Sequence, residues 1–127
     1  ENSSILKIIK LAAEQGFKLV ITTDHGMVYV KKPSQVVGDR ETSTNIRYKT
    51  GKSLTYDEKD VWAITNPEKL FLPKGNLSSK YIFAKNNIFL AYPKNYNHFV
   101  NYYKDTYQHG GISLEEIIIP ISILEPK

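Results

Sequence analysis

Phe17-Lys18-Leu19-Val20-Ile21-Thr22 is a largely apolar run that leads directly into Thr23-Asp24-His25-Gly26. This stretch sets the predicted fold, because an apolar strand that ends in polar residues is typical of a buried strand in an α/β layer. Ligands of such folds gather at the carboxyl ends of the strands. Asp24 and His25 stand at that end. The turn that Gly26 permits would let both side chains converge on one metal ion.

The residues before this strand predict an amphipathic helix. Ser3-Ser4 supplies a candidate N-cap, and Gly16 is a stop signal. Between them, apolar residues recur at helical spacing at Ile5, Ile8, Ile9, Ala12 and Ala13. The order of helix and then strand favours the α/β class.

The rest of the chain predicts further strands and two helices. Strands are expected over 27–31, 34–37, 81–84 and 88–91, the last two as an antiparallel pair joined by a turn at Asn86-Asn87. From 41 to 80 the pattern weakens and indicates short elements and loops. A tyrosine-rich helix is expected over 95–107. Ser113 and Glu116 form a capping box for a short helix, and 117–124, which contains Pro120, is interpreted as an edge strand.

Composition excludes several classes of protein. The chain has 127 residues, enough for one domain, and no cysteine, so disulfides and thiolate zinc sites are excluded. No apolar stretch is long enough to span a bilayer, and a cytoplasmic location without membrane contact is expected. The 17 basic and 13 acidic residues give a formal net charge of +4, but the lysines are scattered and favour a phosphate-bearing partner only weakly. The chain begins at Glu1, so we interpret it as part of a longer protein.

His109 is the second candidate metal ligand. It lies in His109-Gly110-Gly111, where the glycines allow the backbone to approach a ligand closely. Asp105 precedes His109 by four residues, so the two could clasp one ion from a helix face. The preferred alternative is a hydrogen bond that the imidazole N–H donates to the Asp105 carboxylate and that orients the ring. Taken alone, Asp24 could equally cap a turn and His25 could be a core residue.

A second group of polar residues is a candidate phosphate contact. Arg40, Asn45 and Arg47 could bind phosphate oxygens through guanidinium and amide groups. A structural salt bridge between Asp39 and one of the arginines is an equally good interpretation. The aromatic residues from 92 to 107 could stack on bases, but their spacing favours a packed helix face.

The order of these motifs resembles the C-terminal half of the alkaline phosphatase superfamily, and within it the PglZ branch. The segments 36–40, 45–48, 89–93 and 107–116 resemble the effector domain of PorX-type response regulators of Bacteroidetes. The resemblance covers almost all of residues 1–127. It implies a partial α/β/α sandwich with a mixed sheet, which would form the C-terminal portion of a PglZ domain.

The resemblance also implies a dinuclear metal site. Two zinc ions are expected in the intact domain, with manganese as the alternative metal. Asp24 and His25 would bind one ion, and His109 would bind the other. Enzymes of the superfamily use a metal-bound threonine or serine nucleophile and form a covalent phosphoryl intermediate.

The PorX-type resemblance implies a two-component regulator of type IX secretion that hydrolyses oligonucleotide phosphodiesters. Its implied partners are an upstream receiver domain, a sigma factor and a second copy of the protein. The family's nucleophile and remaining ligands precede the Thr-Asp-His-Gly element and are not among these residues, so this chain alone is expected to be inactive. The alternative is a non-catalytic signalling or interaction module that retains the phosphatase fold.

Overall fold

The computed structural model describes residues 3–75 and 78–126. The chain divides into two compact units, one made of residues 1–25 and 118–127 and the other of residues 26–117. Below we call these unit 1 and unit 2. The chain start at Glu1, and positions 76 and 77 of the predicted loop segment, lie outside the described residues.

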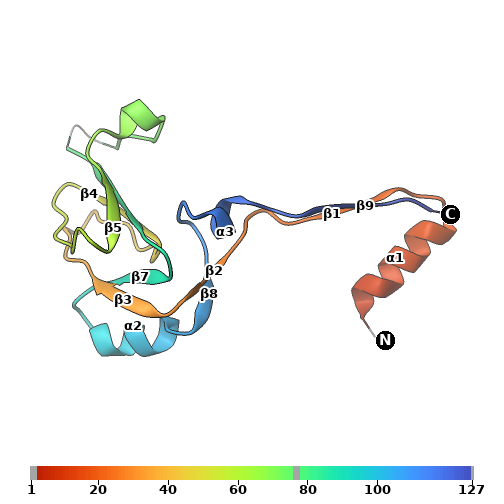
Figure 1. Ribbon diagram of the computed structural model, residues 1–127, viewed down its shortest axis with the longest axis horizontal. Coiled ribbons are helices and arrows are strands. Elements are labelled where there is room, and N and C mark those ends of the chain that lie inside the picture. Colours follow the sequence, from red (N-terminus) through yellow and green to blue (C-terminus); the bar gives the residue numbers. More distant parts are fainter. Residues whose placement is uncertain (1–2, 76–77, 127) are drawn as a thin grey trace. The chain divides into compact units, whose positions relative to one another are not determined.

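Unit 1 consists of one helix and a two-stranded ribbon. Helix α1 (Ser4–Glu14) follows Ser3 as its N-cap, and the chain turns at Gly16, whose φ of 74° is the left-handed conformation that glycine adopts readily. Strand β1 (Leu19–Thr22) pairs antiparallel with β9 (Ile121–Leu124), and the two run side by side in Figure 1. Leu19 is the partner of Leu124 in this pairing. The predicted N-terminal helix, the strand after it and the C-terminal strand after Pro120 are confirmed.

The prediction that the first strand is buried is wrong within unit 1. Val20 keeps 56% of its surface exposed and Ile21 keeps 38%. The apolar face of α1 is also exposed, with no buried residue in the helix. A helix and a two-stranded ribbon contain too few layers to cover both faces of a strand.

Unit 2 contains the other sheets. Strand β2 (Val28–Val30) pairs antiparallel with β8 (Thr106–Gln108), and β3 (Lys32–Gln35) pairs parallel with β7 (Ile88–Ala91). A three-stranded antiparallel sheet has the order β4 (Tyr48–Gly51), β6 (Lys80–Ala84), β5 (Val61–Ile64). A short 3₁₀ helix, η1 (Pro67–Leu70), and two α-helices, α2 (Tyr96–Tyr103) and α3 (Leu114–Ile117), complete the unit.

Strand β7 lies at the centre of unit 2, because all four of its residues are buried. Ile88 and Leu90 pack into one apolar cluster with Val36, Val61 and Ile82. Phe89 and Ala91 point to the opposite face and pack with Val28 and Val30. Alternate residues of a strand point to opposite faces, so a continuous apolar run is what a strand buried on both faces requires.

The short elements expected between 41 and 80 are confirmed, because this segment contains β4, β5 and η1. Two other predictions about unit 2 need correction. Strands β6 and β7 exist as predicted but do not pair with each other, since β6 joins β4 and β5 while β7 joins β3. The predicted helix over 95–107 ends at Tyr103, because Asp105 adopts a φ of 60° and the chain then enters β8.

The α/β class is confirmed, as small sheets with parallel and antiparallel pairing alternate with short helices. The predicted packing role of the tyrosine-rich helix is confirmed for Tyr96 and Tyr103, which pack against the Val28 and Phe89 cluster. In the part of the chain that the structure describes, no helix is long and apolar enough to span a membrane.

Candidate metal centre

Asp24 and His25 follow β1 and form a close acid–imidazole pair in unit 1. His25 Nε2 lies 3.6 Å from Asp24 Oδ1, and the Asp24 side chain is 86% exposed. The single hydroxyl proton of Thr23 has two acceptors within reach, Asp24 Oδ1 at 3.3 Å and the His25 carbonyl oxygen at 3.0 Å from Oγ1. A backbone hydrogen bond within Asp24, followed by the charge of His25, holds the pKa of the Asp24 carboxyl below its usual value.

The spacing of Asp24 and His25 is suitable for two ligands of one metal ion. Ligand atoms about 2.0–2.1 Å from a tetrahedral zinc ion lie about 3.3 Å apart. The observed separation of 3.6 Å needs little adjustment to reach that value. Among residues 3–75 and 78–126, no three His, Asp or Glu side chains gather closely enough to hold a metal. An ion bound by Asp24 and His25 therefore needs additional ligands.

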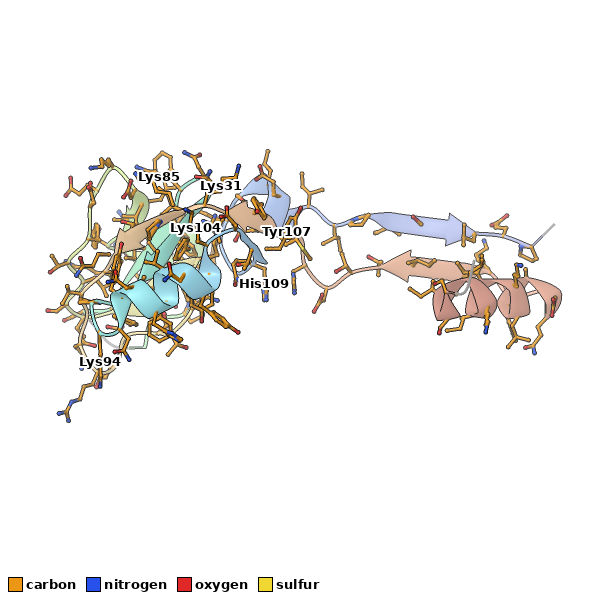
Figure 2. All side chains as sticks on the ribbon, turned by 90° about the horizontal axis from the view of Figure 1, so that it is seen from below. Lys31, Lys85, Lys94, Lys104, Tyr107 and His109 are labelled. Atoms are coloured by element: carbon orange, nitrogen blue, oxygen red, sulfur yellow. The ribbon has the colours of Figure 1, made fainter. Side chains whose placement is uncertain are left out.

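His109 lies in unit 2, immediately after β8, and its side chain is exposed beside Tyr107 at the end of that strand (Figure 2). Two glycines shape the loop that follows. Gly110 has a φ of 98°, and a Cβ atom there would lie 2.7 Å from Asn45 Nδ2. At Gly111 a Cβ atom would overlap the Glu116 carboxylate. Glycine is thus required at both positions for the chain to pass this close to Asn45 and Glu116.

The Glu116 carboxylate fixes this loop from inside unit 2. It accepts hydrogen bonds from the backbone N–H groups of Gly111 at 2.9 Å and Ser113 at 3.2 Å. The bond to Ser113 is the carboxylate half of the predicted capping box, and α3 begins at the next residue. The backbone N–H of Gly26, the residue after His25, donates to the Glu116 carbonyl oxygen at 3.0 Å.

Arg47 neutralises Glu116 through a two-pronged salt bridge. Arg47 Nε and a terminal nitrogen donate to the two carboxylate oxygens at 2.8 Å and 3.0 Å, and both side chains are buried. The other terminal nitrogen of Arg47 donates to the Ile88 carbonyl oxygen of β7. Burial by itself raises the pKa of Glu116, but the hydrogen bonds and charge of Arg47 outweigh it and lower the pKa overall.

Replacing Gly111 by alanine should destabilise unit 2 and displace the His109 loop. The added methyl group would overlap a carboxylate that Arg47 holds in place, so backbone and side chain must move, at a cost of about 1–3 kcal/mol. Urea unfolding measures the loss. Gly75→Ala is the matched control, because a Cβ atom there would meet only Ser79 Oγ at 3.7 Å. Equal stability of the two variants would contradict the close packing of Gly111 on Glu116.

The structure places Asp105 differently from its prediction. No helix contains both Asp105 and His109, because α2 ends at Tyr103 and β8 lies between them. The interpretation of a shared helix face is therefore wrong. The Asp105 carboxylate lies beside Tyr29, where burial and the charge of Asp105 raise the pKa of the Tyr29 hydroxyl.

Arg40, Asn45 and Arg47 also separate in the structure. Arg40 is exposed and lines a surface cavity, so it is accessible to a ligand. Asn45 Oδ1 accepts from the backbone N–H groups of Arg47 at 2.8 Å and Tyr48 at 3.2 Å, which shapes the turn before β4. Arg47 has no exposed surface and is occupied by Glu116 and Ile88. Arg47 therefore stabilises the His109 loop and does not make the predicted phosphate contact.

Sequence reasoning missed the role of Glu116 as the acceptor that organises the His109 loop. The capping-box pattern identified Glu116 as a helix start, but its partner Arg47 lies 69 residues earlier in the chain. The available signal was a pair of glycines followed by a glutamate five residues after Gly111. Its partner Arg47 lies within the weakly patterned segment from 41 to 80. No local spacing rule connects those positions.

The family model of the BREX system PglZ alkaline phosphatase-like domain matches residues 2–123 of this chain. The chain belongs to this family. The match includes both candidate metal-ligand segments of the PglZ chain, Asp24-His25 and His109, and the α/β architecture described above agrees with it. A comparison with curated proteins found no match.

Proposed function

We propose that this PglZ chain supplies Asp24, His25 and His109 to a dinuclear zinc site that hydrolyses phosphodiesters. The observation that carries the proposal is the Asp24–His25 pair, whose ligand atoms lie 3.6 Å apart within a chain of the PglZ family. Zinc bound there would act as a Lewis acid on a phosphoryl oxygen and would favour an ionised nucleophile.

The residues of this chain would position the ligands. Thr23 holds the Asp24 carboxylate and the His25 backbone through its hydroxyl group. Gly110, Gly111 and Glu116 fix the backbone that presents His109. Such outer contacts restrict the orientation of a ligand and usually matter for affinity. The fixed loop in unit 2 supports a binding role for His109.

We further propose that the chain is the C-terminal portion of its PglZ domain, in a PorX-type response regulator that acts on oligonucleotide-type substrates. The motif order in 36–40, 45–48, 89–93 and 107–116 supports this assignment. Completion of the site requires a nucleophile and further carboxylate and histidine ligands from residues other than those of this chain. A receiver domain, a sigma factor and a second protein copy are the proposed partners, and manganese is the alternative metal.

Elemental analysis of a parent protein containing this chain tests the proposal. We expect about two zinc ions per chain in the parent and few in the 127-residue chain. Asp24→Ala and His109→Ala should each reduce the zinc content and abolish hydrolysis of bis(4-nitrophenyl) phosphate. His98→Ala is the control for His109, since His98 is an exposed histidine on α2 that packs against Phe99 and Tyr102. Unchanged zinc content and activity in both ligand variants would refute the proposed site.

A second candidate function is a non-catalytic interaction module. The exposed apolar surface of unit 1 favours it, because Ile5, Ile8 and Ile121 each leave 60% or more of their surface uncovered. Exposed apolar patches often mark contact surfaces. A parent protein without zinc that still dimerises or binds a sigma factor would support this candidate over the hydrolase.

A further inference from the structure

Lys49 is a buried lysine in unit 2, and no carboxylate in residues 3–75 and 78–126 neutralises it. It lies on β4 with 1% of its surface exposed. Among the described residues, its ammonium group makes no ion pair, and it lies over the ring of Tyr92, with 4.3 Å from Nζ to the ring centroid. Buried lysines are rare unless they are paired, because removing an ammonium ion from water is costly. The attraction to an aromatic ring offsets only part of that cost.

Lys49 lines a cavity of about 250 Å³. Thr44 also lines this cavity. The rest of the wall is mostly apolar and comes from the loop before β4, from the end of β7 and from α2: Ile46, Leu90, Ala91, Tyr92, Phe99 and Tyr103. Ile46 and Tyr103 pack against the core, and Leu90 N–H donates to the Ile46 carbonyl oxygen at 2.7 Å. The cavity is therefore built on fixed elements and has the size of a small organic molecule.

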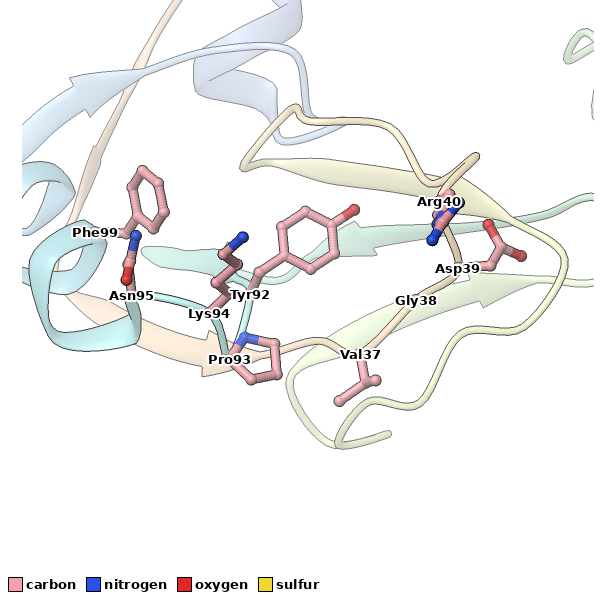
Figure 3. A pocket seen from close by; sticks show the side chains of 9 residues that line it. All are labelled: Val37, Gly38, Asp39, Arg40, Tyr92, Pro93, Lys94, Asn95 and Phe99. Carbon is pink, nitrogen blue, oxygen red and sulfur yellow. The ribbon is translucent and has the colours of Figure 1, made fainter.

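A second cavity shares Tyr92 and Phe99 with the first and carries two exposed cations. Figure 3 shows Tyr92 between Lys94 on one side and Arg40 on the other. Asp39 also lines this cavity, but its carboxylate already accepts hydrogen bonds from the backbone N–H groups of Glu41 and Ser53 and from the Thr42 hydroxyl group. Exposed cations next to a cavity raise the local concentration of anions from solution.

The charge inside the cavity selects the class of anion. One buried ammonium group balances one negative charge, whereas a phosphate dianion would leave an uncompensated charge among apolar walls. A carboxylate carries a single charge at neutral pH and accepts hydrogen bonds from an ammonium group in a compact geometry. The aromatic and aliphatic walls favour an apolar body on the same molecule.

We propose that the Lys49 cavity binds a small monocarboxylate with an apolar or aromatic body, whose carboxylate pairs with Lys49 Nζ. The site lies wholly within unit 2 and uses none of the residues that we assign to the metal centre. A ligand there would act as a cofactor or effector of the domain.

Titration calorimetry of the full chain with benzoate and with hexanoate tests this site, with a chelator present so that metal has no part in it. We expect both acids to bind and benzyl alcohol and inorganic phosphate to bind at least roughly tenfold more weakly. Lys49→Met should weaken benzoate binding by at least about tenfold. Lys80→Met is the matched control, since Lys80 is an exposed lysine on the neighbouring strand β6 and should leave binding unchanged.

A second measurement does not depend on a variant. A ligand that binds only the folded state stabilises it, so benzoate should raise the unfolding temperature of the unmodified chain, and benzyl alcohol at the same concentration should raise it less. The proposal is overturned if benzoate does not bind, if it binds Lys49→Met as well as the original chain, or if it fails to raise the unfolding temperature. Preferential binding of phosphate would also overturn it.

Discussion

Replacing Arg47 by methionine should lower the free energy of unfolding of unit 2 by about 3–5 kcal/mol. The substitution would leave the Glu116 carboxylate buried without its cation, and the Ile88 carbonyl oxygen would lose a donor. Methionine keeps most of the apolar volume, so the loss reports mainly the uncompensated charge. Urea denaturation followed by tyrosine fluorescence or circular dichroism measures it.

Arg40→Met is the matched control for Arg47→Met. Arg40 is exposed, and substitutions of exposed charges usually change stability by no more than about 0.5 kcal/mol. In the double variant Arg47→Met with Glu116→Gln, the combined loss should be smaller than the sum of the single losses, because each single variant already breaks the same contact. Additive losses, or equal effects at Arg47 and Arg40, would contradict a coupled buried pair.

Replacing Lys49 by methionine should have the opposite effect and raise the free energy of unfolding by about 2–3 kcal/mol at pH 7. Burial lowers the pKa of the Lys49 ammonium group from 10.5 to about 8. A depression of this size corresponds to roughly 3 kcal/mol against the charged form in the folded state. Methionine fills similar space without that charge, although it loses the contact of the ammonium group with Tyr92.

The same pKa predicts a pH dependence of known sign. Below about pH 8 Lys49 is charged in both the folded and the unfolded state, so the folded state bears the full free-energy cost of burying that charge. Between about pH 8 and 10.5 the unfolded chain retains a proton that the folded chain releases, and the contribution of Lys49 to stability rises with pH. Burial raises the pKa of the neighbouring Tyr92 hydroxyl, which delays its ionisation in the folded state.

Denaturation curves measured from pH 7 to 10 check this prediction. The stability gained on replacing Lys49 by methionine should shrink as the pH rises, because the original lysine loses its charge. The gain should be absent in Lys80→Met, whose side chain is exposed. A loss of stability in Lys49→Met, or a gain that does not change with pH, would show that Lys49 does not carry a buried charge at neutral pH.

Local patterns predicted the elements of this fold well. The structure confirms three elements that were predicted from neighbouring residues alone. They are the helix before Gly16, the strand that follows it and the C-terminal strand after Pro120. The partners of β6 and β7 could not be predicted in this way. The residues Asn86-Asn87 are compatible with the two-residue turn of a hairpin, and Asn86 adopts a φ of 45°. However, β7 belongs to another sheet, where it pairs parallel with β3.

Burial was the property that local patterns predicted least well. Leu19-Val20-Ile21 and Ile88-Phe89-Leu90 are similar apolar runs, yet the first is largely exposed in unit 1 and the second is buried on both faces in unit 2. The difference arises from the layers that pack on each strand. These layers are contributed by segments distant in the chain, such as Val61 and Val28 for β7.

For the candidate sites, the sequence by itself determined which ligand chemistry is available. It placed a carboxylate beside an imidazole at Asp24-His25, and a second imidazole before two glycines at His109. Only the tertiary structure decided that Arg47 is a buried partner of Glu116 and that Lys49 lines a cavity. The physical reason is that metal-binding motifs are short and local. Burial and charge pairing depend on contacts between residues as far apart as Arg47 and Glu116.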